Sequence, residues 1–110
     1  MEVVQDRRNS AIIIYLMGRL DSGTSREFGK KLLDLVQSGE NRLVLDLKGL
    51  DYISSSGLRV LLKAAKELKQ KQGRISLCRV KEHIREVFEM SGFISFLPIY
   101  GTLEEALKNT

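Results

Sequence analysis

The 110-residue chain has few residues of several types, and each shortage excludes a class of protein. It contains one cysteine, Cys78, and one histidine, His83, so it cannot form an internal disulfide or supply a histidine and cysteine zinc cluster. It has no tryptophan and only 6% aromatic residues, although Lys and Arg number 18 against 14 Asp and Glu. Basic side chains with so few aromatic neighbours are typical of a solvated surface. We therefore expect no metal, no cofactor and no direct contact with nucleic acid.

Long apolar runs are also missing. The longest, residues 11–17, has the length of a strand and falls far short of the roughly 20 residues that a membrane-spanning helix needs. The first six residues lack the pattern of a signal peptide. Together with the single cysteine, these absences predict a cytoplasmic protein with no membrane segment. Cys78 lies in a strand-like run, so we expect a small buried side chain and not a nucleophile.

The hydrophobic content of 43% and the charged content of 29% are typical of one ordinary globular domain, which we place at residues 1–110. Strand-like runs alternate with segments of helical periodicity, and this order predicts an α/β sandwich. We expect a mostly parallel sheet of four or five strands, an antiparallel edge made by the first two, and about four helices. The expected strands lie at residues 3–4, 11–17, 42–47, 75–80 and 97–100.

Helix starts and stops are marked by short signals. Thr24 with Glu27, and Thr102 with Glu105, have the spacing of capping boxes and predict that a helix follows each threonine. Gly92 follows a helical pattern and predicts its carboxyl-terminal end.

The most informative segment is Ser54-Ser55-Ser56-Gly57, which lies between the strand at 42–47 and a periodic helix at about 56–71. The free N–H groups and the dipole of a helix N-terminus favour an anion, so a serine there is placed to carry a phosphate. Serine is also a preferred N-cap, and capping alone explains one of the three hydroxyls. The two interpretations are compatible, since one serine can cap the helix while its neighbour stays exposed.

Basic and apolar side chains near this segment allow two interpretations each. Arg59, Lys63 and Lys66 recur on one helix face that starts beside the serines, either as a solvated face or as the rim of a site for an acidic partner. Phe93, Ile94 and Phe96 are expected in the core, although they would also suit a partner surface.

Catalytic patterns are sparse. No Gly-x-Ser-x-Gly elbow or phosphate-binding loop is present, and His83 lies among charged residues, as a solvated side chain would. Asp21, Asp46 and Asp51 suggest the phospho-accepting acids of a response-regulator receiver, but the paired acids expected after a first strand are missing. We therefore expect that the protein is not an enzyme.

The chain resembles a STAS domain, the family that includes bacterial anti-sigma factor antagonists and cytoplasmic domains of sulphate transporters. Four motifs in order carry the resemblance over nearly the whole chain. They are Gly18-Arg19-Leu20-Asp21, Leu43-Val44-Leu45-Asp46-Leu47 with Leu50-Asp51-Tyr52-Ile53, Ser54-Ser55-Ser56-Gly57-Leu58 and Glu89-Met90-Ser91-Gly92-Phe93.

The resemblance implies a switch. In the antagonists, the unphosphorylated protein binds a partner that is both serine kinase and anti-sigma factor, and this binding frees the sigma factor. The partner phosphorylates the first serine of Ser-Ser/Thr-Gly, which ends the binding. Counted from Gly57, the acceptor is Ser55, with Ser54 and Ser56 as lesser alternatives. Ser54 stands where many antagonists have Asp, which favours a STAS scaffold that is never phosphorylated as one alternative. A small-molecule or nucleotide sensor is the other.

The same resemblance gives the surface expected to bind the partner, an anti-sigma factor that is also a serine kinase. The residues of this surface are Asp21, Ser54, Ser55, Ser56, Gly57, Arg59 and Lys63. We expect the protein to be a monomer.

Overall fold

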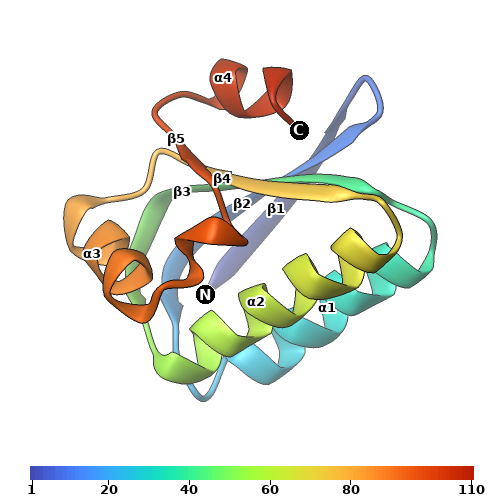
Figure 1. Ribbon diagram of the computed structural model, residues 1–110. Helices are drawn as coiled ribbons and strands as arrows, with labels where there is room; N and C mark the ends of the chain where they lie inside the picture. The colour runs from blue at the N-terminus through green and yellow to red at the C-terminus, as the bar shows by residue number, and fades with distance from the viewer.

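The computed structural model describes residues 1–110 as a five-stranded sheet with helices on both faces (Figure 1). The strand order is β1-β2-β3-β4-β5; β1 and β2 are antiparallel, and the other neighbours are parallel. The expected fold class is confirmed. The elements are β1 (Glu2–Arg8), β2 (Ala11–Leu20), α1 (Ser25–Gln37), β3 (Arg42–Ile53), α2 (Ser55–Gln70), β4 (Arg74–Cys78), α3 (Glu82–Ser91), the 3-10 turn η1 (Phe93–Ser95), β5 (Ile99–Tyr100) and α4 (Leu103–Lys108).

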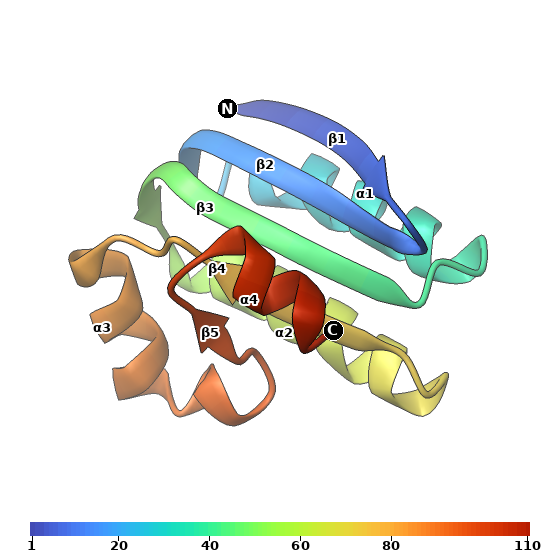
Figure 2. The same ribbon diagram turned by 90° about the horizontal axis from the view of Figure 1, so that it is seen from above.

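Two cores lie on opposite faces of the sheet. Helices α1 and α2 lie side by side on one face, and the short helix α4 covers part of the other (Figures 1 and 2). Successive residues of β2 point to opposite faces, so Ile12 and Ile14 join the larger core while Ile13 packs in the smaller one under α4. Burial on both faces explains why this strand is an unbroken apolar run.

Strands β2 and β3 are longer than the sequence predicts, because β2 continues to Leu20 and β3 to Ile53. Their pairing shifts register twice, first between Tyr15 and Met17. A side chain at Gly49 would place its Cβ 2.5 Å from Met17 Cγ, so glycine lets the strands stay paired where a break was expected. The extension carries the chain directly to the serine segment.

Most of the local signals are confirmed. Gly92 ends α3 in the left-handed conformation with φ +77°, and the Thr102 hydroxyl accepts the Glu105 N–H at 3.1 Å at the start of α4. Cys78 is fully buried, and this burial raises the pKa of its thiol to about 12. None of the helices has both the length and the apolar character of a membrane span.

Candidate functional site

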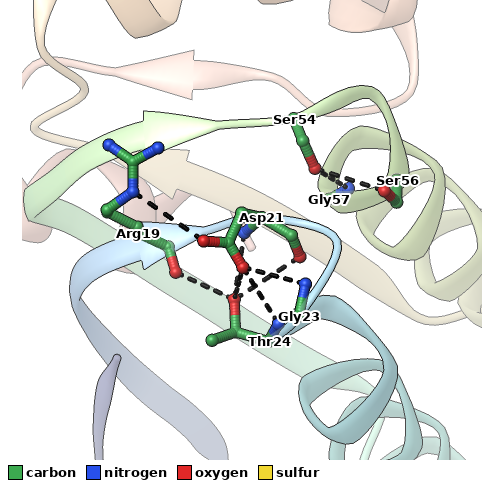
Figure 3. A network of polar contacts seen from close by, with 7 residues as sticks. All are labelled: Arg19, Asp21, Gly23, Thr24, Ser54, Ser56 and Gly57. Carbon is green, nitrogen blue, oxygen red and sulfur yellow. Dashed lines mark hydrogen bonds and ion pairs between the residues drawn. The ribbon is translucent and has the colours of Figure 1, made fainter.

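The serine segment and the Asp21 loop meet at one edge of the sheet. Strands β2 and β3 are parallel neighbours, so their carboxyl ends lie together and the helices that follow them start side by side (Figure 3). The backbone N–H of Ser54 donates to the carbonyl of Leu20 at 2.9 Å and holds the two ends together. Two segments that are distant in sequence therefore form one continuous surface.

The three serines have different environments. Ser54 is the N-cap of α2, with an extended backbone, and its Oγ accepts the Gly57 N–H at 3.1 Å. Ser56 is half-buried, and its Oγ lies 3.3 Å from that of Ser54. Ser55 is exposed, and its hydroxyl makes no hydrogen bond within the chain. Capping and an exposed hydroxyl thus occur together, on adjacent serines.

Gly57 is buried where α2 approaches the end of β2. A Cβ at this position would lie 2.8 Å from the Leu20 carbonyl oxygen and 3.0 Å from Ile53 Cγ1. Because the crowding lies within the chain, this position needs a glycine for a tight turn into the helix. Gly57 therefore acts by letting the helix start press against the sheet.

The Asp21 side chain orders the turn that leads into α1. Its Oδ1 accepts hydrogen bonds from the N–H groups of Gly23 and Thr24, at 3.0 and 3.1 Å. Thr24 occupies the N-cap position and α1 follows it, as predicted, but the capping-box hydrogen bond is wrong, because the Thr24 hydroxyl turns back to donate to the Arg19 carbonyl at 2.9 Å. Partial desolvation is the largest single effect on Asp21 and raises its pKa. The hydrogen bonds that its carboxylate accepts together outweigh this effect, so the pKa of Asp21 is lowered.

Two arginines, one on each segment of the site, contribute positive charge near the serines. Arg19 lies 4.2 Å from the centre of the Tyr52 ring and 3.8 Å from the Asp21 carboxylate, at the rim of the site. Arg59 follows Ser55 by one helical turn, is exposed and forms no ion pair. The first turn of α2 contains no acidic residue. The electrostatics at Ser55 therefore favour an anion.

The predicted partner residues do not all gather around Ser55. Asp21, the three serines and Gly57 meet at the sheet edge, and Arg59 is one turn away. Lys63 lies a turn further along α2, where it lines a hollow of about 450 Å³ between α1 and α2. The structure therefore places Lys63 beside α1 and away from the serines.

A contact between β3 and the start of α3, which the sequence did not reveal, holds the end of the strand that leads to the serine segment. Lys81 forms an ion pair with the Asp51 carboxylate, and His83 Nε2 donates to the Asp51 carbonyl at 2.7 Å. The hydrogen bond and charge of Lys81 lower the pKa of Asp51. His83 is exposed as expected, but it is bonded to the protein. No local pattern indicates a contact between residues 30 positions apart.

Asp46 is too enclosed for the receiver-like interpretation. Its side chain is 1% exposed, and its Oδ2 accepts Arg79 Nε at 3.0 Å and Arg79 Nη2 at 2.5 Å. Hydrogen bonding to Asp46 raises the pKa of the Arg79 guanidinium. No group of three or more His, Cys, Asp or Glu side chains is placed to hold a metal ion.

Comparison with known proteins identifies the family. The sequence model of the STAS domain matches residues 2–106, so the chain belongs to the STAS domain family. It is 45% identical to BtrV of Bordetella bronchiseptica over 106 residues, which cover 96% of this chain and 91% of the relative. It is 31% identical to the anti-sigma F factor antagonist of Paenibacillus polymyxa, over 97% of this chain and 92% of the relative.

A solved structure shares the architecture. The Bacillus cell fate determinant SpoIIAA in its phosphorylated form superimposes with a TM-score of 0.77 at 24% identity, over 98% of each chain. At this identity the likeness establishes the fold alone.

Proposed function

We propose that this protein is an anti-sigma factor antagonist whose binding is switched off by phosphorylation of Ser55. The unmodified protein binds an anti-sigma factor that is also a serine kinase, and thereby releases the sigma factor. The observation that carries the proposal is the free, exposed hydroxyl of Ser55 beside the capping hydroxyl of Ser54. The name of the Paenibacillus relative supports the antagonist part of the proposal.

The switch acts on the interface and leaves the fold intact. A phosphate adds about −1.5 to −2 charges at pH 7, and the N-terminus of α2 tolerates them because its dipole and free N–H groups favour an anion. Arg59, one turn on, is free to pair with the phosphate. A partner packed over Ser55 would have to desolvate a dianion, which costs much more than desolvating a hydroxyl. Binding is therefore lost while the domain stays folded.

Phosphosite mapping is the first test. The protein is incubated with ATP and the serine-kinase anti-sigma factor of the same organism, and the products are analysed by mass spectrometry. We expect one phosphate on Ser55, no modification of the Ser55→Ala variant, and continued modification of Ser56→Ala. Phosphate on Ser54 or Ser56 in the wild type would contradict the assignment.

A charge at Ser55 tests the mechanism. We expect Ser55→Asp to weaken the complex by about tenfold or more, with an unchanged melting temperature, because the charge meets the partner and not the core. Ser55→Ala should bind as the wild type does. Gln70→Glu, which places a negative charge at the other end of the same helix, is the matched control and should bind normally. Equal weakening by both acidic variants would point to net charge instead of a local switch.

Ser54 favours a second candidate function. It stands where many antagonists resembling this chain have Asp, and its hydroxyl is engaged in capping. A STAS scaffold that binds its partner permanently would suit a chain that the kinase does not recognise. Stable complex formation with no phosphate after prolonged incubation would support the scaffold and exclude the switch.

A further inference from the structure

A second exposed feature lies at the far end of α2. It is a groove of about 290 Å³ between the end of α2, the edge of β4 and the segment from η1 to β5. We call it the Phe96 groove. Its lining includes Lys69, Arg74, Ile75, Phe96, Tyr100 and Asn109. This volume is at the lower end of the range for ligand sites, which favours a few residues of a peptide over a large cofactor.

The aromatic wall of the groove differs from the sequence prediction. Phe96 was expected in the core, but it is 38% exposed, because the next residue, Leu97, fills the core position. The ammonium groups of Lys66 and Lys69 lie 5.6 and 5.7 Å from the centre of the Phe96 ring. The ring is therefore held at the surface between two cations.

The charge of the groove is uncompensated. None of its lining residues is acidic, and Lys66, Lys69 and Arg74 take part in none of the five ion pairs of the protein. Their side chains make no hydrogen bond within the chain either. Other cations, such as Arg79 and Lys81, are paired with carboxylates. Two free lysines beside the exposed ring and a free arginine in the groove lining favour an occupant with carboxylates beside an apolar side chain.

Strand β4 borders the groove on one side. Only Leu77 and Cys78 of β4 pair with β5, but Ile75, which belongs to the groove lining, is only 5% exposed. The groove therefore presents side chains, and not an unpaired strand edge, to an occupant.

We propose that the Phe96 groove binds a short acidic segment of a protein partner. The carboxylates of the segment pair with Lys69 and Arg74, and an apolar side chain rests on Phe96. Lys69 follows Ser55 by 14 residues, about 21 Å along the helix, so this site is separate from the switch. Its occupancy does not depend on the phosphorylation of Ser55.

Fluorescence anisotropy with a labelled probe tests the proposal on the whole protein. The probe is an eight-residue peptide of alternating Glu and Val, and the reference probes are the Lys and Val peptide and a ten-nucleotide oligouridine. We expect the acidic peptide to bind, and to bind about fivefold or more weakly in Lys69→Glu and in Phe96→Ser. Lys31→Glu, the same change at an exposed lysine of α1, and Ser55→Asp should leave its affinity unchanged.

Amide chemical shifts locate the bound peptide. Its resonance changes should centre on Ile75 and Phe96 and leave residues 54–57 unmoved. Absence of binding, equal weakening by Lys69→Glu and Lys31→Glu, or shifts centred on the serines would overturn the proposal. Tighter binding of the oligouridine than of the acidic peptide would also overturn it, in favour of a nucleic-acid site. Circular dichroism of each variant confirms that the fold is retained.

Discussion

The hydroxyl of Ser54 accepts the backbone N–H of Gly57 at 3.1 Å, and this contact separates the roles of adjacent serines. Ser54 is committed to the start of α2, so its replacement lowers the stability of the domain. Ser55 has no partner within the chain, so its replacement changes only what the surface presents. A pair of alanine variants can therefore distinguish the serine that caps the helix from the one proposed as the phosphorylation site.

We expect Ser54→Ala to lower the free energy of unfolding by about 1 kcal/mol, because the Gly57 N–H loses its acceptor at the helix start. Ser55→Ala should stay within about 0.5 kcal/mol of the wild type, as is usual for exposed positions without bonds. Urea unfolding followed by circular dichroism measures both. A larger loss for Ser55→Ala than for Ser54→Ala would show that the two roles are exchanged.

Gly57→Ala should destabilise the protein by about 1–3 kcal/mol, because the added methyl overlaps the Leu20 carbonyl and the start of α2 must move away from β2. Gly23→Ala is the control in the neighbouring loop, where a Cβ would make an ordinary contact of 3.4 Å with Asp21 Oδ1. Thermal unfolding of the two variants gives the comparison. Equal melting temperatures would mean that the crowding at Gly57 is relieved at no cost.

The serine segment was predictable because its signals are local. Three hydroxyls and a glycine before a periodic helix indicate an N-terminus whatever the rest of the chain does. The start of α1 was not predictable in the same way. Thr24 and Glu27 have capping-box spacing and Thr24 is the N-cap, but its hydroxyl bonds to the Arg19 carbonyl of the preceding loop and not to the helix. Which acceptor the Thr24 hydroxyl takes depends on the path of the chain at the end of β2, and the local sequence does not determine that path.

The local sequence gives no signal for contacts between distant strands and turns. Asp46 and Arg79 are 33 positions apart, and neither has a neighbour that indicates the other. The exposure of Phe96 depends likewise on Leu97 taking the adjacent core position. Hydrophobic periodicity predicted the elements and the layers, whereas these pairings depend on register and on turns of the chain.

The Asp46 and Arg79 pair gives a further prediction. Arg79→Gln should lower the free energy of unfolding by about 2 kcal/mol, because it leaves a carboxylate that is 1% exposed without its cation. The value is below that of a fully buried pair, since the Arg79 side chain is 38% exposed. Arg85→Gln, which breaks an exposed pair with Glu89 on α3, should cost no more than about 0.5 kcal/mol. Urea unfolding at pH 7 compares them, and equal losses would contradict a special role for Asp46.

Cys78 links stability to alkaline pH. The folded protein keeps the thiol protonated until the pH approaches about 12, whereas the unfolded chain ionises near the ordinary value of 9.0. Between these values the unfolded state binds fewer protons, so the free energy of unfolding falls as the pH rises. Cys78→Ala lacks this thiol. We therefore expect the stability of the wild type, measured relative to Cys78→Ala by urea unfolding, to be constant below pH 8 and to decrease above pH 9. A difference that stays constant from pH 7 to pH 10.5 would show that the buried thiol ionises as readily as an exposed one.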